Sequence, residues 1–307
     1  MTDKWDSALT DFKNYLQLER SFSGNTVEAY IRDLSKLKEY ITLKQYPLAP
    51  ADVDSSTLSE LMVYLNSLGL ERSSQARLLS SIKTFYKYLL IENLIVKDPT
   101  GLMASPKIHR KLPEVLTFEE IEAILTGIDL SAPNGTRNRA IVEVLYACGL
   151  RVSELTELRL TNIFTEIGFL KVIGKGNKER IIPVGEEALK YMQLYIRHVR
   201  NKISPQKGAE NIVFLNNRGA ALSRVMIFLM IKEMALQAGI DKTVSPHTFR
   251  HSFATHLLEG GADLKVIQDL LGHESITTTE IYTHLDAEYL KETVLAFHPR
   301  NIKARNP

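Results

Sequence analysis

Residues 245–261 read Ser-Pro-His-Thr-Phe-Arg-His-Ser-Phe-Ala-Thr-His-Leu-Leu-Glu-Gly-Gly, and this stretch decides how the last third of the chain folds. A serine followed by proline starts a helix well, because the serine oxygen caps free N–H groups and proline suits the first turn. The two glycines favour the end of that helix. His247 and Arg250, three residues apart, then share a face near the helix N-terminus, where an anion is favoured.

Two further polar residues follow this helix. Asp263 and Gly272 bound a short expected helix, so His273 would extend from the turn behind it. The pattern Thr277-Thr-Thr-Glu280 is a capping box, which places Tyr282 near the start of another helix. The polar neighbours of Tyr282 favour a role outside the apolar core.

A glycine-rich stretch upstream marks the one β-like region of the chain. Residues 169–173 and 180–184 flank the glycine-rich residues 174–178. This arrangement predicts a hairpin whose turn carries Lys175 between two glycines. A lysine on such a tip can reach into a groove and donate a proton.

Arg151 and Glu154 follow a helix that should end at Gly149, and Glu154 is placed to orient an arginine. Guanidinium groups grip phosphate oxygens in pairs, and a phenol attacks as a nucleophile when a base or a cationic setting activates it. The pattern therefore predicts phosphoryl transfer on a phosphodiester. The candidate catalytic residues are Arg151, Lys175, His247, Arg250, His273 and Tyr282.

Three histidines on one expected helix raise the alternative of a zinc site. His251 follows His247 by four residues, but the HExxH pattern is absent and no cysteine or nearby carboxylate completes a ligand set. We therefore predict no metal and no other cofactor, and packing or hydrogen-bonding roles for His251 and His256. Cys148, in an apolar stretch, is predicted to be a core residue rather than a nucleophile.

The composition is that of an ordinary soluble chain. Its 307 residues suggest two domains, and 44% hydrophobic content is enough to form real cores. No apolar run reaches the length of a bilayer span, no signal peptide is evident, and one cysteine fits a reducing cytoplasm. The net charge of +2 is weak for a nucleic-acid binder, so charge alone does not indicate DNA.

Helical periodicity and prolines divide the chain. Residues 1–105 predict four amphipathic helices that form a small bundle, and residues 106–113 predict an extended basic linker. Residues 114–307 begin with a capping box at Thr117–Glu120 and contain the hairpin, which predicts a mainly helical α+β domain. Basic residues beside the linker and the hairpin turn are the candidate DNA contacts: Lys107, Arg110, Lys111, Lys178 and Arg180.

The order Arg151, Lys175, His247-x-x-Arg250, Leu-Gly-His273 and Tyr282 resembles the active site of the tyrosine recombinases (phage integrase family). The segments around these residues resemble the bacterial Xer branch of that family: residues 149–155, 174–180, 246–258 and 278–284. The N-terminal bundle resembles the family's SAM-like core-binding domain, and Phe297-His-Pro-Arg300 resembles the Xer C-terminus. The resemblance covers nearly the whole chain.

The resemblance implies a site-specific recombinase that cleaves and rejoins duplex DNA through a 3′-phosphotyrosyl intermediate and a Holliday junction. It implies that His247 assists proton transfer, that Lys175 is the general acid and that His273 hydrogen-bonds the phosphate. The expected partners are a short near-palindromic DNA site and three further protomers, in a homotetramer or a heterotetramer with a paralogue. A C-terminal segment from Tyr289 to Phe297 would exchange between protomers.

The sequence leaves several alternatives open. An integrase of a phage or mobile element shares the motifs, although this chain starts almost directly with the bundle and so favours resolution of chromosome dimers. Three alternatives come from other functional classes: a non-catalytic sequence-specific DNA-binding protein, a helical interaction protein and a type IB topoisomerase. The sequence does not reveal the target site, the division of proton transfer between His247 and Lys175, or whether an FtsK-like translocase activates the enzyme.

Overall fold

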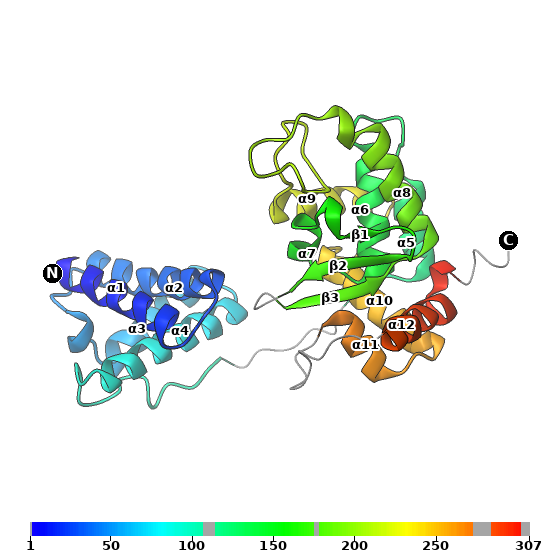
Figure 1. Cartoon of the computed structure of the whole chain (residues 1–307). Helices are drawn as coiled ribbons and strands as arrows, with labels where there is room; N and C mark the ends of the chain where they lie inside the picture. The colour runs from blue at the N-terminus through cyan, green and yellow to red at the C-terminus, as the bar shows by residue number, and fades with distance from the viewer. Residues whose placement is uncertain (1, 107–113, 175–177, 273–283, 302–307) are drawn as a thin grey trace. The chain divides into compact units, whose positions relative to one another are not determined.

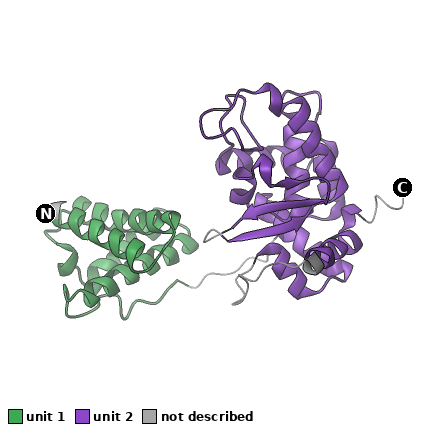
Figure 2. Cartoon of the chain, viewed as in Figure 1, with its two compact units in different colours: residues 1–111 green, residues 112–307 purple. Residues whose placement is uncertain are grey.

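The computed structural model describes residues 2–106, 114–174, 178–272 and 284–301. The chain divides into two compact units, residues 1–111 and 112–307 (Figure 2). The division lies inside the segment 106–113 that the sequence predicts as a linker. Among the described residues, no helix is both long and apolar enough to cross a bilayer.

The N-terminal unit is the predicted bundle of four helices. These are α1 (Thr2–Leu18), α2 (Gly24–Leu43), α3 (Ser55–Ser67) and α4 (Arg72–Ile91) (Figure 1). Their apolar faces meet in one core, in which the rings of Phe12 and Phe85 are 5.2 Å apart and fully buried. The helix ends follow local chemistry: Asp54 caps α3 by accepting a hydrogen bond from the Thr57 N–H.

The C-terminal unit is mainly helical with a small sheet, as predicted. Its first helices are α5 (Phe118–Thr126), α6 (Gly135–Cys148) and the short α7 (Val152–Thr156), and α8 (Glu186–His198) and α9 (Arg224–Gln237) follow the sheet. The last three are α10 (Pro246–Gly260), α11 (Leu264–Leu271) and α12 (His284–Phe297). Helix α6 is buried along its length, and α8 and α10 pack against it (Figure 1).

Three antiparallel strands in the order β1-β2-β3 form the sheet. The predicted hairpin is confirmed as β2 (Phe169–Ile173) and β3 (Glu179–Pro183), with Val172 opposite Arg180. The two-residue strand β1 (Ile163–Phe164) was not predicted, because a segment of that length carries no period of its own. Alternation along β3 turns Arg180 and Ile182 to the buried face.

The expected helix ends that fall on described residues of this unit are confirmed, whereas the capping box expected at Thr277–Glu280 lies outside the described residues. Thr117 and Ser245 accept hydrogen bonds from the N–H groups three residues on, as capping residues do. Gly149 and Gly272 end α6 and α11 with φ of +56° and +64°, a conformation that favours glycine. At Gly149 a side chain would also collide with the ring of Phe253.

Helix α12 packs on its own unit, against α10, α11 and β3. Leu290 and Val294 are buried there in a cluster with Phe253 and Leu257. The segment that the sequence predicts for exchange between protomers is thus seated within this chain, which was the alternative considered for it. Behind α12, Arg300 pairs with Glu122 and Glu143, and the His298 ring is fully buried.

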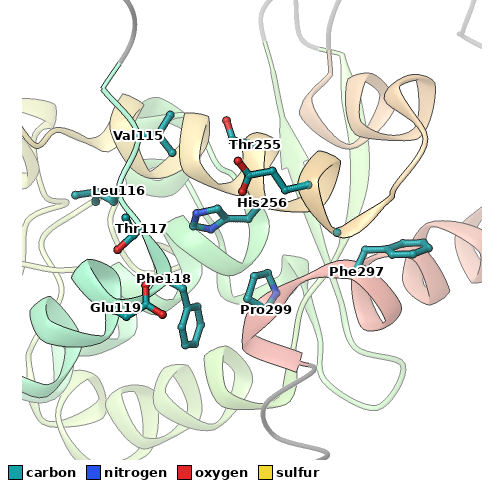
Figure 3. A pocket seen from close by; sticks show the side chains of 11 residues that line it. Val115, Leu116, Thr117, Phe118, Glu119, Thr255, His256, Phe297 and Pro299 are labelled. Carbon is teal, nitrogen blue, oxygen red and sulfur yellow. The ribbon is translucent and has the colours of Figure 1, made fainter.

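A cavity of about 730 Å³ lies beside this C-terminal segment (Figure 3). Residues 115–119 form one wall, the C-terminal half of α10 forms another, and Phe297 and Pro299 close it. None of the candidate catalytic residues is among the residues that line this cavity.

Candidate active site

Arg250 extends from α10 into the interior and is 9% exposed. Its Nη1 donates to the carbonyl of Gly149 at 2.8 Å, and its Nη2 donates to the carbonyl of Leu271 at 2.6 Å. Burial and the neighbouring guanidinium of Arg151 lower the pKa of Arg250 to about 10. The side chain therefore stays charged at neutral pH, although its location makes the charge costly in the absence of an anion.

Arg151 stands at the N-cap of α7 and is half-buried. Its Nη1 donates to Glu154 Oε1 at 2.9 Å, and its Nη2 donates to the carbonyl of Gly272 at 3.1 Å. The carbonyls of Leu271 and Gly272 are successive in the chain and accept from Arg250 and Arg151 respectively. The two guanidinium groups are thereby held next to each other at the C-terminal end of α11.

Glu154 lies beneath this pair, and its side chain is 1% exposed. Burial alone would raise the pKa of its carboxyl, but hydrogen bonds and charge from Arg180 and Arg151 outweigh burial and lower that pKa. Glu154 is therefore an anion in the folded protein. Its place under Arg151 is the one that the sequence suggested for orienting an arginine.

Arg180 has a different setting from the solvent-facing basic residue that the sequence suggested. It is 7% exposed, and both of its terminal nitrogens donate to the carboxylate of Glu154, at 2.6 and 2.8 Å. A signal for this placement was in the sequence. Arg180 and the apolar Ile182 are two residues apart, so they lie on the same, inward face of β3. Lys178, one residue before β3, is exposed.

His247 is exposed in the first turn of α10, three residues before Arg250. The other candidate residues lie outside the described part of the chain: Lys107, Arg110, Lys111, Lys175, His273 and Tyr282. Gly174, which precedes Lys175, donates to the carbonyl of Lys178 at 2.7 Å, and Gly272, which precedes His273, ends α11.

The remaining histidines of α10 have separate settings. His256 is buried and its Nδ1 lies 2.8 Å from the hydroxyl of Tyr146, which confirms a structural role. His251 is exposed, so the expected packing role was wrong for this residue, which falls on the outer face of α10. Cys148 is confirmed as a core residue, and burial raises the pKa of its thiol. In the described ranges no group of three His, Cys, Asp or Glu side chains could hold a metal ion.

The described part of the site is a preorganised anion cradle. Arg151, Arg180 and Arg250 carry three positive charges and Glu154 carries one negative charge, which leaves 3 − 1 = +2 around the end of α11. Fixed donors of this kind stabilise a phosphoryl group best when its charge grows in the transition state. The arrangement suits phosphodiester chemistry by a nucleophile placed opposite these donors.

Comparison with known proteins identifies the family. The phage integrase family model matches residues 114–289, and the model of the phage integrase N-terminal SAM-like domain matches residues 9–93. The chain is 42% identical to the tyrosine recombinase XerD of Staphylococcus saprophyticus, over 96% of this chain and 99% of that protein. It is 44% identical to the tyrosine recombinase XerD of Chlorobaculum tepidum, over 97% of this chain and 98% of the relative.

A solved structure supports the same fold. The XerH site-specific recombinase, bound to a palindromic difH substrate after cleavage, aligns with a TM-score of 0.68 and 24% identity. The alignment covers 90% of this chain and 81% of that one. Together with the arginine cradle, the two matched domains and the full-length relatives show that this chain belongs to the phage integrase family and is a site-specific tyrosine recombinase.

Proposed function

We propose that this recombinase resolves chromosome dimers in the cytoplasm by cutting and rejoining two copies of a short, near-palindromic DNA site. The observation that carries the proposal is the pair of adjacent guanidiniums, Arg151 and Arg250, held over the buried carboxylate of Glu154. Such a pair fits the two non-bridging oxygens of one phosphodiester. The similarity to XerD proteins over nearly the whole chain favours the Xer role over that of a mobile-element integrase.

In the proposed reaction the phenol oxygen of Tyr282 attacks the scissile phosphorus. A phosphotyrosyl bond forms at the 3′ end, the P–O5′ bond breaks, and the 5′ oxygen leaves as a hydroxyl. Because an unperturbed tyrosine has a pKa of about 10, it needs a base or a cationic setting at neutral pH. His247 assists the removal of the phenol proton, Lys175 protonates the 5′ oxygen, and His273 hydrogen-bonds the phosphate.

The arginines supply the electrostatic part of catalysis. Arg250 gains more from an anion than an exposed arginine would, because burial and Arg151 disfavour its charge while the cradle is empty of phosphate. The energy stays in the phosphotyrosyl bond, so rejoining needs no nucleotide cofactor. The freed 5′ hydroxyl of the partner duplex attacks the adduct, which restores Tyr282 and forms a Holliday junction; a second round on the other strands completes the exchange.

Two duplexes with two cut positions each require four protomers, so the working assembly is a tetramer of this chain alone or with a paralogue. The N-terminal bundle and the basic residues of the linker and hairpin would hold the DNA backbone: Lys107, Arg110, Lys111 and Lys178. Phosphate contacts of this kind make binding weaken steeply with salt. The segment Tyr289–Phe297 would leave its own unit and dock on a neighbour during synapsis.

Covalent capture on genomic DNA tests the proposal. The full-length protein is incubated with fragmented DNA from its own source, denatured adducts are trapped, and the attached ends are sequenced. Tyr282→Phe is the matched control, because it keeps the ring and removes only the nucleophilic oxygen. We expect adducts of the unaltered protein, and none of the variant, at one short near-palindrome in the chromosome.

The other outcomes are equally informative. Adducts at the ends of a mobile element would replace dimer resolution by integration. Plasmid relaxation without site preference would indicate a type IB topoisomerase. Adducts that persist in Tyr282→Phe would assign the nucleophile to another residue, and DNA binding with no adduct at any site, with or without a paralogue and a translocase, would overturn the catalytic proposal.

A further inference from the structure

The proposed reaction assigns no role to Arg180. Its surroundings are unusual for a basic residue in a hairpin that is proposed to bind DNA. Its guanidinium is buried and makes three hydrogen bonds: two to Glu154, and one from Nε to the carbonyl of Leu270 at 3.1 Å. Burying a charge is costly unless it is paired and hydrogen-bonded. Arg180 is therefore engaged by the protein itself, on the inner side of the cradle.

The carboxylate of Glu154 depends on Arg180 for half of its hydrogen bonds. Oε1 accepts from Arg180 and from Arg151 Nη1, and Oε2 accepts from Arg180 and from the Arg151 backbone N–H. A carboxylate offers about four acceptor positions, so all of those of Glu154 are filled. Glu154 cannot turn without breaking a bond to one of the arginines, and Arg180 thus fixes the support under Arg151.

Arg180 also holds the end of α11. Three consecutive carbonyls, those of Leu270, Leu271 and Gly272, accept from Arg180, Arg250 and Arg151 respectively. A side chain at Gly272 would meet the Arg180 side chain at 3.1 Å, so the two residues are in tight contact. The three guanidiniums share one scaffold, and Arg180 is the most buried of them.

We propose that Arg180 is a positioning residue of the recombination reaction, which fixes Glu154 and the end of α11 so that Arg151 and Arg250 meet the scissile phosphate in register. This inference rests on the proposed phosphodiester chemistry. Arg180 does not contact DNA; it acts through Glu154. Arginine suits the role because its planar fork matches a carboxylate with two bonds, which lysine cannot do. Misplacement of a catalytic group by about 1 Å can cost on the order of 10²-fold in rate.

The test uses the full-length protein and the DNA site recovered by covalent capture. Three quantities are measured for Arg180→Gln and Arg180→Lys: the single-turnover rate of adduct formation at saturating protein, the DNA affinity as a function of salt, and the melting temperature. We expect both variants to form adduct on the order of 10²-fold more slowly, with unchanged affinity and salt slope. If Arg180→Lys keeps the charge but forms adduct as slowly as Arg180→Gln, the reaction needs the two parallel hydrogen bonds from Arg180 to Glu154.

Arg200→Gln is the matched control. Arg200 is 5% exposed in the same unit, and its Nε donates only to the carbonyl of Ile212 at 2.9 Å while its Nη2 donates to the carbonyls of Ala209 and Glu210. Its loss should lower the melting temperature and leave the adduct rate of the folded fraction unchanged. A double variant of Arg180→Gln and Glu154→Gln should be no slower than the slower single variant, because the two residues act as one unit.

Each contrary result has a distinct meaning. A rate equal to that of the unaltered protein, or single effects that multiply in the double variant, would overturn the positioning role. Weaker binding with a salt slope reduced by about one would show that Arg180 contacts a phosphate instead. Failure of the unaltered protein to form any adduct would overturn the proposed function itself, and so is distinguishable from these outcomes.

Discussion

Two buried glutamates in the C-terminal unit each hold a pair of arginines, yet the two clusters have different uses. Glu143 binds Arg139 and Arg300, whose side chains are 10% and 12% exposed. Glu154 binds Arg180 and Arg151, and the Arg151 side chain is 31% exposed. The residue types are the same in both clusters. The clusters differ in whether one guanidinium stays accessible to an incoming anion. Of the two, only the Glu154 cluster has such a group, that of Arg151.

The Glu143 cluster connects elements that are far apart in the sequence. Arg300 reaches it from the C-terminal segment, and Arg139 also donates to the carbonyl of Leu125 and lies over the ring of Tyr191, 4.5 Å from its centroid. The pairing of Arg300 holds the end of the C-terminal segment on α6. The comparison therefore predicts that the first cluster affects stability alone, whereas the second, whose Arg180–Glu154 pair is also buried, affects chemistry as well.

Glu143→Gln should have the largest effect of the variants considered, and this effect should be on the free energy of unfolding. It leaves two buried arginines without their carboxylate, and loss of one partner of a buried ion pair costs about 3–5 kcal/mol. We expect the free energy of unfolding to fall by this amount in denaturant titrations, while the folded fraction forms adduct at the normal rate. An adduct rate that falls as far as in Glu154→Gln would remove the distinction between the clusters.

Arg151→Gln should have nearly as large an effect, but on the reaction barrier. Removal of one preorganised donor costs on the order of 10²–10³ in rate. Single-turnover adduct formation on the captured site should slow by this factor, with little change in melting temperature because Arg151 is partly open to solvent. Arg139→Gln is the control and should show the opposite pattern; equal losses of rate in the two variants would contradict the comparison.

The buried His298 beside the Glu143 cluster should make stability depend on pH. Burial, with the nearby His256 and Arg300, lowers the pKa of His298 to about 3, whereas the unfolded residue titrates near 6.5. Below pH 6.5, His298 binds a proton in the unfolded chain but stays neutral in the folded chain. The free energy of unfolding should therefore fall by about 1.4 kcal/mol per pH unit on acidification.

His298→Phe checks this expectation, because phenylalanine suits the contacts with the rings of Tyr146 and Phe253 and has no proton to bind. Its melting temperature should change less between pH 6.5 and pH 5 than that of the unaltered protein. Equal slopes for the two proteins would show that His298 does not carry the pH dependence. The buried His256, whose pKa burial also lowers, would then be the group to replace.

The smallest effect is expected at a third buried carboxylate, in the N-terminal unit. Asp33 is fully buried and accepts from Arg77 at 2.9 Å and from Ser81 at 3.0 Å, and the Arg77 side chain is 51% exposed. This cluster resembles that of Glu154 in presenting a held but open guanidinium. Arg77→Gln should weaken DNA binding modestly and reduce the salt slope by about one, as loss of one phosphate contact does. Arg77→Lys keeps the charge and should keep the slope; an unchanged slope in Arg77→Gln would exclude the contact.

Much of the fold was predictable because it depends on neighbours in sequence. Helical periodicity located the four helices of the bundle, and a capping residue or a glycine located the ends of α5, α6, α10 and α11. The β2–β3 hairpin followed from a glycine-rich turn between two β-like segments. The strand β1 and the helix α9 were not predicted, because a short or a uniformly apolar segment gives no clear period. The helix α8 was not predicted either, although its sequence is amphipathic.

The sequence by itself determined the family, the residue types of the candidate site and the helix turns on which Arg250 and Arg151 stand. Only the tertiary structure decided which charges meet. Arg250 finds its acceptors at Gly149 and Leu271, and Arg180 finds Glu154 from 26 residues away, because buried charges must be paired and the packing of α6, α7, β3 and α11 places those partners within reach. Local chemistry sets where an element begins and ends, whereas the packing of distant elements sets whether an arginine faces DNA, a carboxylate or another arginine.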